Sequence, residues 1–254
     1  MTARYLLHSD GLGTLARYVA PDTLFAFDLD GTLAPIVEDY TAAKISAPVK
    51  ATLKKLVKLA KVAVITGRSR KDALKIIGFE PHLLVGNHGA EWPFQEGNPD
   101  RQQTGHCLNW REQLHELLGY VQGVEIEFKG ESISIHYRKS TDPENALSII
   151  DTAIEKLIPV PKRIGGKFVV NLLPMDAFTK GEALLAAMDK FGLKRAIYFG
   201  DDETDEVVFK LKNVDLFGIH IGKNDLTAAQ YFLNNQSELL GLLNSMAETL
   251  ELHP

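Results

Sequence analysis

A short apolar stretch that ends in two closely spaced aspartates constrains this chain more than any other feature of its sequence. Leu24–Phe27 is typical of a buried strand, and the pentapeptide Asp28–Thr32 (Asp-Leu-Asp-Gly-Thr) follows it directly. Aspartates two positions apart on a strand point to the same side, and neighbouring carboxylates repel each other unless a proton or a cation lies with them. Asp28 and Asp30 therefore indicate a metal site, or an acid beside a nucleophile, unless they are ordinary turn residues after an edge strand.

Strands alternate with helices in the N-terminal third of the chain and again near its end. The apolar runs expected to form strands are 24–27, 62–65, 83–85, 196–199 and 216–221. The expected helices are 46–59, 69–77, 180–191, 205–211 and 237–250. This alternation predicts an α/β fold with a doubly wound, Rossmann-like parallel sheet, in which ligands bind beyond the carboxyl ends of the strands.

The pattern changes between residues 92 and 173. A polar loop (95–105) and a helix (108–118) precede two alternating segments, 125–129 and 132–138, which predict a hairpin. A second helix (144–157) and two short strands (162–164 and 168–173) complete an α+β insertion. We therefore expect a catalytic core formed by 1–91 and 174–254, with 92–173 inserted as a cap domain.

Composition excludes several classes of partner and site. The 254 residues are 45% hydrophobic and carry a formal net charge of −5, which does not favour a nucleic-acid partner. The single cysteine, Cys107, excludes an intrachain disulfide framework. No apolar run approaches the roughly 20 residues that span a bilayer, and Tyr5–Leu7 is too short for a secretory signal. We expect a soluble, cytoplasmic protein with no membrane partner; its oligomeric state is left open.

Further acids follow the other predicted strands. Asp201 comes directly after strand 196–199 and Gly200, so it is expected to meet Asp28 across adjacent strand ends. Asp202 and its acidic neighbours have a simpler explanation, because acids stabilise the first turn of a helix. Several carboxylates in one crevice are hard oxygen ligands of the kind that Mg²⁺ accepts, with waters and phosphate completing the coordination.

Lys180 is an independent indication of an anionic ligand. A cation in the first turn of a helix opposes the helix dipole, which costs roughly 0.3–1 kcal/mol. The simple interpretation is a solvated surface lysine after the N-cap Thr179. An anion bound between Lys180 and the helix N-terminus would reverse the sign of the effect, and phosphate is the natural anion opposite a metal. Thr66, before its own helix, offers a hydroxyl to the same oxygens.

These residues together resemble the haloacid dehalogenase superfamily of phosphatases. The resemblance lies in Asp28–Thr32, Thr66–Arg68, Lys180 and Gly200–Asp205, which occur in the superfamily's order with a cap-sized insertion between the second and third. It implies Asp28 as the nucleophile, Asp30 as general acid and then base, and Thr66 and Lys180 as phosphate binders. It further implies a Mg²⁺ site, with metal residues Asp28, Asp30 and Asp201. The auxiliary acids that it implies are Asp202 and Asp205.

A closer resemblance, to trehalose-6-phosphate phosphatases, runs from about Phe25 to Leu250. It is carried by Gly86–Glu91, Glu127–Ser132, His136–Arg138, Gly166–Lys167 and Lys180–Leu184. The substrate-binding residues implied are Gly67, Arg68, His88, Glu127, Lys129, His136, Arg138, Lys167 and Asn171. Members of that family usually have a glutamate at the position of Asn171; an amide still binds hydroxyls but carries no charge.

The expected function is thus Mg²⁺-dependent hydrolysis of trehalose 6-phosphate, a small-molecule sugar phosphate, through an aspartyl-phosphate. Three alternatives stay open: a related phosphatase for another sugar phosphate, a phosphomutase, and a non-catalytic sugar-phosphate sensor. From periodicity alone, the polar face of the predicted hairpin could also be merely solvated.

Overall fold

The computed structural model describes residues 2–37, 42–93, 101–166 and 168–252, and Lys167 lies outside these ranges. The chain divides into a core unit, Met1–Gly89 with Thr179–Pro254, and a cap unit, Ala90–Phe178. The cap unit is a few residues longer at each end than the insertion expected from the sequence. The extra residues belong with it because Ala90 and Ala177 pack in a small apolar cluster with Leu173.

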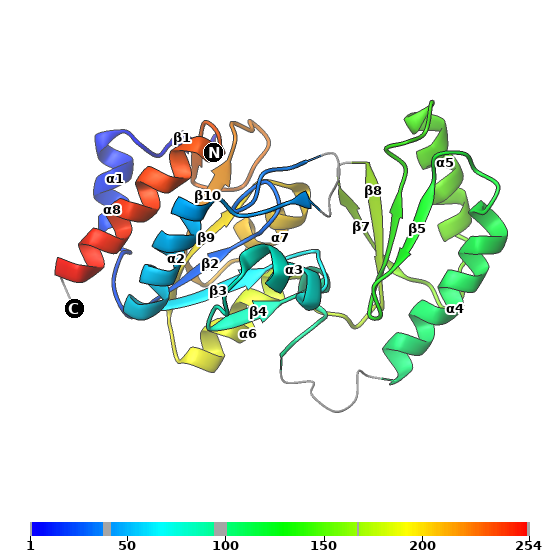
Figure 1. Ribbon diagram of the computed structural model, residues 1–254, viewed down its shortest axis with the longest axis horizontal. Helices are drawn as coiled ribbons and strands as arrows, with labels where there is room; N and C mark the ends of the chain where they lie inside the picture. Colours follow the sequence, from blue (N-terminus) through cyan, green and yellow to red (C-terminus); the bar gives the residue numbers. More distant parts are fainter. Residues whose placement is uncertain (1, 38–41, 94–100, 167, 253–254) are drawn as a thin grey trace. The chain divides into compact units, whose positions relative to one another are not determined.

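The core unit is built on a seven-stranded sheet in which every pair of neighbouring strands is parallel. Its order is β1-β11-β10-β9-β2-β3-β4. The strands are β1 (Arg4–Tyr5), β2 (Thr23–Phe27), β3 (Lys61–Ile65), β4 (Leu83–Val85), β9 (Arg195–Gly200), β10 (Asp215–Ile221) and β11 (Tyr231–Leu233). The central strands β2 and β9 lie side by side, so the residues that follow them meet at the same edge of the sheet (Figure 1).

Helices cover both faces of this sheet, which confirms the predicted doubly wound fold. They are α1 (Ser9–Ala16), α2 (Ala47–Leu59), α3 (Arg70–Ile77), α6 (Lys180–Phe191), α7 (Glu206–Phe209) and α8 (Leu239–Leu252). Phe25 and Phe27 face the layer that contains α2 and α8, where Phe27 stacks on Phe199 with ring centroids 4.9 Å apart. The alternate residues of β2, Leu24 and Ala26, are buried on the opposite face of the sheet. Helix α6 contacts β3 and α7, and α7 contacts β10.

Local signals explain where several helices begin and end. Ser46 caps α2 by accepting from the Val49 N–H, and Ser69 caps α3 in the same way. Gly78 ends α3 and Gly192 ends α6, both in the left-handed conformation that glycine adopts without strain. The sequence therefore positions these helices through their caps as well as through their apolar faces.

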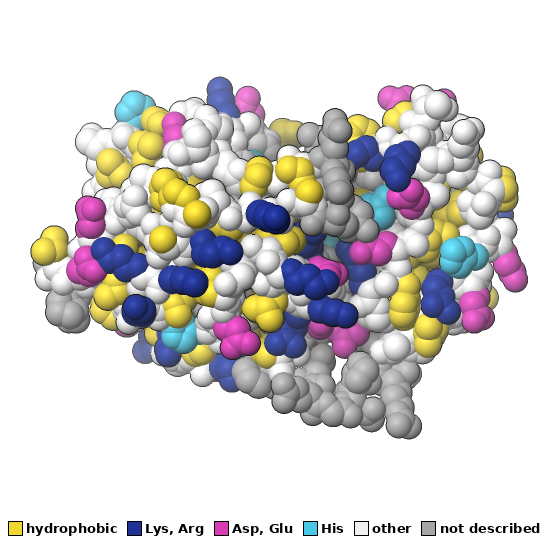
Figure 2. All heavy atoms as spheres, viewed as in Figure 1, with side chains coloured by type: hydrophobic (Ala, Val, Ile, Leu, Met, Phe, Trp, Pro, Cys, Tyr) yellow, Lys and Arg dark blue, Asp and Glu magenta, His cyan; other side chains and the backbone are white. Residues whose placement is uncertain are grey.

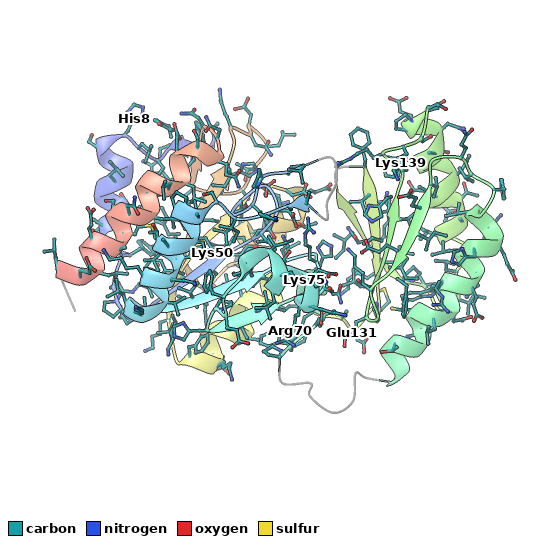
Figure 3. All side chains as sticks on the ribbon, viewed as in Figure 1. His8, Lys50, Arg70, Lys75, Glu131 and Lys139 are labelled. Atoms are coloured by element: carbon teal, nitrogen blue, oxygen red, sulfur yellow. The ribbon has the colours of Figure 1, made fainter. Side chains whose placement is uncertain are left out.

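The cap unit is an antiparallel sheet of order β5-β6-β8-β7 with two helices on one face (Figure 1). Its elements are α4 (Arg101–Leu118), β5 (Glu125–Phe128), β6 (Ile133–His136), α5 (Pro143–Ile154), β7 (Lys162–Gly166) and β8 (Val169–Leu173). Trp110 of α4, Ile150 of α5 and Ile135 of β6 share one apolar cluster. Figure 3 shows Glu131 at the turn of the β5–β6 hairpin and Lys139 at its other end, where the Lys139 ammonium pairs with Glu125 at 2.6 Å.

Some expected boundaries were wrong. Helix α4 begins at Arg101, inside the segment expected to be a loop, and α5 ends at Ile154 rather than at 157. Strand β1, helix α1 and strand β11 were not expected from the sequence at all. Two or three strand residues give too short a pattern to recognise, and β1 and β11 are held mainly by pairing with each other and with β10.

The face of the core unit seen in Figure 2 is mixed rather than apolar. Lysine and arginine side chains are interspersed with hydrophobic and neutral ones over α2 and α3 (Figure 2). Within the part of the chain that the structure describes, no helix has both the length and the apolar character needed to cross a membrane.

Candidate active site

The site begins where β2 ends. The Asp28 N–H donates to the Phe199 carbonyl at 2.8 Å, so Asp28 continues the pairing of β2 with β9 by one residue. The chain then turns at Gly31, whose φ of +80° favours glycine, and the Gly31 N–H bonds to the Ala34 carbonyl at 2.7 Å. This turn leaves the Asp28 side chain buried at the carboxyl edge of the sheet.

Three carboxylates gather at this edge. One oxygen each from Asp28, Asp201 and Asp205 lies within 4.8 Å of the others. Asp201 directly follows β9, and its Oδ1 accepts from the Thr32 hydroxyl at 3.0 Å. A side chain at Gly31 would collide with the Asp201 carboxylate, so this glycine is required by contact as well as by φ. Asp28 and Asp201 therefore lie close together, as the sequence predicted.

Lys180 is buried in the same cluster rather than solvated on the surface. Its ammonium lies 2.9 Å from Asp28 Oδ1 and 2.8 Å from Asp205 Oδ1. It is the first residue of α6, after a capping box in which Thr179 and Glu182 bond to each other's backbone N–H groups. The two carboxylates offset the unfavourable position of a cation at a helix N-terminus.

Asp205 accepts four hydrogen bonds, which is the capacity of a carboxylate. Its Oδ1 accepts from Lys180 Nζ at 2.8 Å and from the Tyr198 hydroxyl at 2.6 Å. Its Oδ2 accepts from the backbone N–H groups of Asp201 and Asp202 at 3.0 and 3.1 Å. Asp205 therefore orients its neighbours, and these four bonds make it a weaker candidate ligand than Asp28 or Asp201.

Burial and neighbouring charge shift the proton affinities of these groups. Burial, with the charges of Asp205 and Asp201 added, raises the pKa of Asp28 well above its usual value, although Lys180 opposes the shift. Burial and Asp205 likewise raise the pKa of Asp201 to about 7. Burial alone would lower the pKa of Lys180, but the attraction of Asp205 and Asp28 outweighs burial and raises it. Tyr198 keeps its proton, because burial and Asp205 raise its pKa well above the usual value.

The donor set fits a divalent metal ion. With all three carboxylates ionised (−3) and one ammonium (+1), this largely buried cluster carries two negative charges. Carboxylate oxygens are the ligands that hard cations such as Mg²⁺ prefer. Asp28 and Asp201 could hold such an ion, which would favour the ionised form of both.

Asp30 lies outside the acidic cluster, although the sequence grouped it with the metal residues. Both of its oxygens are engaged by Arg68, with Nε to Oδ2 and Nη2 to Oδ1 each at 2.6 Å. Such a bidentate pair fixes the plane of the carboxylate. Arg68 in turn lies after β3, where its N–H donates to the Thr66 hydroxyl at 3.2 Å. Asp202, which the resemblance makes an auxiliary acid, serves as an N-cap and accepts from the Glu203 N–H at 2.7 Å.

His88 packs against the loop that carries Thr66. The His88 N–H donates to the Thr66 carbonyl at 2.9 Å, and the Asn87 N–H donates to the Arg68 carbonyl at 2.8 Å. A side chain at Gly67 would collide with the buried His88 ring. Both Asn87 and His88 have positive φ (49° and 58°), an uncommon conformation that clusters at functional sites. The predicted residues Thr66, Gly67, Arg68 and His88 therefore form one local unit.

Four of the predicted cap residues form two groups of contacts, one around Glu127 and one at Asn171. Glu127 Oε2 lies 2.9 Å from His136 Nε2 and 3.5 Å from Lys129 Nζ. Burial opposes ionisation of Glu127, but His136 and Lys129 outweigh it and lower its pKa. Asn171 accepts a buried hydrogen bond from Ser134 at 2.6 Å, in the row of paired residues that also contains Glu127. Arg138 is exposed beyond the end of β6, and Lys167 lies outside the described residues.

Tyr198 and Ser134 were not among the residues expected from the sequence. Tyr198 offered one signal, a hydroxyl within an otherwise apolar buried strand, which needs a hydrogen-bond partner. Ser134 offered only its place on the polar side of a predicted hairpin strand. Its bond to Asn171 depends on the pairing of β6 with β8, which sequence periodicity does not reveal.

Known proteins resemble this chain along nearly its whole length. A protein of Oryza sativa subsp. japonica named probable trehalose-phosphate phosphatase 4 is 28% identical over 87% of this chain and 65% of its own length. The trehalose-phosphate phosphatase of Mycobacterium ulcerans is 29% identical over 95% of this chain and 67% of its own. The chain thus spans about two thirds of the length of these curated relatives.

Solved structures show the same fold. The C-terminal domain of C. albicans trehalose-6-phosphate phosphatase has a TM-score of 0.79 at 21% identity, covering 98% of this chain and 99% of that one. A sucrose-phosphatase of Synechocystis has a TM-score of 0.54 at 20% identity, with 90% of each chain covered. The family model described as trehalose-phosphatase matches residues 26–237. The chain therefore belongs to the trehalose-phosphatase family.

Proposed function

We propose that this protein hydrolyses trehalose 6-phosphate to trehalose and phosphate in a Mg²⁺-dependent reaction. The observation that carries the proposal is the buried contact of Lys180 with Asp28 at the carboxyl edge of the sheet, beside Asp201. A carboxylate that could act as nucleophile, a cation that could bind phosphoryl oxygens and a candidate metal pair thus lie close together. Membership of the trehalose-phosphatase family supports the substrate.

In the proposed reaction, a carboxylate oxygen of Asp28 attacks phosphorus while the bond from phosphorus to the sugar oxygen breaks. Asp30 protonates the departing sugar oxygen and later takes a proton from the water that hydrolyses the aspartyl-phosphate. Lys180 and Thr66 bind the phosphoryl oxygens. A bound Mg²⁺, held by Asp28 and Asp201, would supply positive charge opposite the lysine.

In the proposed reaction, Arg68 has to change its contact with Asp30. Asp30 must meet the departing sugar oxygen, and later water, through a carboxylate oxygen, and Arg68 engages both of its oxygens. Arg68 must therefore release at least one oxygen of Asp30 when the substrate binds. The phosphoryl group itself is a suitable new partner for the guanidinium.

The cap residues Glu127, Lys129, His136 and Asn171 would bind sugar hydroxyls. They share the sheet face on which Glu127 contacts both Lys129 and His136, so donors and acceptors are presented together. Exposed Arg138 would add a further cation, and we extend the same role to Lys167. Such contacts, remote from phosphorus, orient the substrate and can be expressed in turnover.

Phosphate release from a panel of sugar phosphates, with Mg²⁺ and after exhaustive chelation, tests the proposal. The panel should include trehalose 6-phosphate, sucrose 6-phosphate, glucose 6-phosphate and a small aryl phosphate. We expect trehalose 6-phosphate to have the highest kcat/KM and activity to disappear on chelation and return with Mg²⁺. Full activity after chelation, or an isomeric sugar phosphate as the product, would refute it.

A second candidate substrate is another sugar phosphate. Asn171 favours this reading, because members of the family usually have a charged glutamate at that position. A neutral amide hydrogen-bonds a hydroxyl less strongly than a carboxylate does. The same panel decides between the two, since the second candidate predicts that a different sugar phosphate has the highest kcat/KM.

A further inference from the structure

The hydroxyl of Tyr198 shares a carboxylate oxygen with the lysine of the site. Tyr198 donates to Asp205 Oδ1 at 2.6 Å, and Lys180 donates to the same oxygen at 2.8 Å. Both side chains and Asp205 are buried, with Tyr198 and Asp205 fully so. Any movement of this oxygen therefore changes its hydrogen bond with Lys180.

The two oxygens of Asp205 are held by different parts of the chain. Oδ2 is held by backbone N–H groups of Asp201 and Asp202, within the turn that Asp205 itself belongs to. Within the described part of the chain, Oδ1 accepts from two side chains, those of Lys180 and Tyr198. Lys180 has a long flexible side chain, so Tyr198 is the rigid partner of Oδ1.

Tyr198 is well suited to hold that oxygen still. It lies within β9, paired on one side with β2 and on the other with β10. Its ring contacts Phe209 edge to face, with centroids 5.8 Å apart and an interplanar angle of 74°. A tyrosine has two side-chain torsions, so a ring packed in a central strand leaves its hydroxyl little freedom.

The position of the Asp205 oxygen affects how Lys180 is shared between two carboxylates. Its ammonium lies 2.9 Å from Asp28 and 2.8 Å from Asp205, which leaves one N–H to donate to a phosphoryl oxygen. Because Tyr198 donates to the same oxygen, the negative charge of Oδ1 is shared between two donors, and its attraction for Lys180 is weaker than it would be for Lys180 alone. We propose that Tyr198 is a positioning residue that keeps Lys180 shared between Asp205 and the nucleophile Asp28.

This proposal rests on the proposed phosphatase function, and Tyr198→Phe tests it. The change removes the hydroxyl and keeps the ring. We expect kcat to fall about tenfold, for trehalose 6-phosphate and for a small aryl phosphate alike, because a lost bond to a charged group is worth at least that much. KM should change less than kcat, and the half-saturating Mg²⁺ concentration should not change, since Asp205 is not proposed as a metal ligand.

Tyr18→Phe is a matched control. The Tyr18 hydroxyl also donates to a carboxylate at 2.6 Å, that of Asp215, but Asp215 is the first residue of β10, at the amino edge of the sheet. Tyr18→Phe should leave kcat unchanged. A kcat for Tyr198→Phe equal to that of the control would overturn the proposal.

A double-mutant cycle separates positioning from general destabilisation. In an Asp205→Asn background, Tyr198→Phe should cost less than about twofold in kcat, because the oxygen it positions no longer carries the charge that holds Lys180. Losses in kcat that add fully in the double variant would contradict the proposal. So would losses in kcat no larger than the fraction of unfolded protein, measured by thermal unfolding.

Binding of inorganic phosphate, measured by calorimetry with Mg²⁺ present, gives a readout that does not depend on turnover. Tyr198→Phe should weaken phosphate binding several-fold and Tyr18→Phe should not; equal affinities would count against Tyr198. A wild-type chain that binds phosphate and hydrolyses neither substrate would refute the proposed function, while the phosphate affinities would still decide the role of Tyr198.

Discussion

At the scale of single residues, the site depends on a few atoms that occupy one small volume. Asp28, Asp201 and Lys180 are chemical groups, but Gly31 and Gly67 matter because they have no side chain. Gly31 faces the Asp201 carboxylate and Gly67 faces the His88 ring. The Asp-Leu-Asp-Gly-Thr sequence thus supplies the proposed nucleophile, Asp28, and also the space that the Asp201 carboxylate occupies.

Gly31→Ala should therefore damage the metal site more than the fold. The new methyl group would displace the Asp201 carboxylate, and positive φ adds strain of roughly 1–3 kcal/mol. We expect the half-saturating Mg²⁺ concentration to rise by about tenfold or more. Gly222→Ala is the control, because Gly222 has a φ of +92° with open space around it. An equal Mg²⁺ requirement in the two variants would show that strain alone matters.

The acidic cluster should also make the metal-free protein sensitive to pH. Because the pKa of Asp201 is raised to about 7, the folded chain holds a proton there that the unfolded chain releases above about pH 4. This group therefore lowers the free energy of unfolding as pH rises from about 4 to 7, and its full cost is present above 7.

Asp201→Asn removes that charge and keeps an oxygen for the Thr32 hydroxyl. In EDTA we expect its Tm to exceed that of the wild type at pH 8 and to approach it at pH 5. Saturating Mg²⁺ should reverse the order at pH 8, because the ion stabilises only a chain that binds it. Identical Tm differences at the two pH values would contradict the raised pKa.

At the scale of secondary structure, strand ends and helix starts bring the chemistry together. Asp28, Thr66 and Asp201 follow β2, β3 and β9, and Lys180 begins α6. These placements were predictable, because apolar runs followed by polar residues mark strand ends and Thr179 with Glu182 marks a helix start. The Arg68–Asp30 pair and the Tyr198–Asp205 bond were not predictable, since they join residues through side-chain rotamers and strand order.

The cap sheet should select the substrate through its polar face. Lys129→Ala should lower kcat/KM for trehalose 6-phosphate by about tenfold or more, and for a small aryl phosphate much less. Asn171→Ala should show the same selectivity with a smaller loss, because a neutral hydrogen bond is weaker than a charge-assisted one.

Lys139→Ala is the matched control for these cap variants. Its ammonium pairs with Glu125 on the same hairpin, but both side chains are largely exposed. It should leave both substrates unaffected. Equal losses on the two substrates for Lys129→Ala would assign Lys129 to folding, and no loss on either would mean that the polar face is simply solvated.

At the scale of the whole molecule, the chain combines two units with separate apolar cores. The sequence predicted a parallel α/β core interrupted by an α+β insertion, because each unit has its own periodicity. It did not predict β1, α1 or β11, whose short segments depend on partners distant in the chain. Asn171 shows the same limit. The sequence alone indicated that an amide stands where the family usually has a glutamate, whereas the bond of Asn171 to Ser134 depends on how β6 and β8 pair.

The central claim is that Asp28 is the nucleophile of a sugar-phosphate phosphatase. The most direct test is the rate of phosphate release from trehalose 6-phosphate by purified Asp28→Asn, beside wild-type protein with Mg²⁺ at saturation. An amide cannot form the aspartyl-phosphate, so we predict no turnover above background from a variant whose Tm, measured in EDTA, is at or above the wild-type value. Phosphate release at a near-normal rate from folded Asp28→Asn would contradict the account.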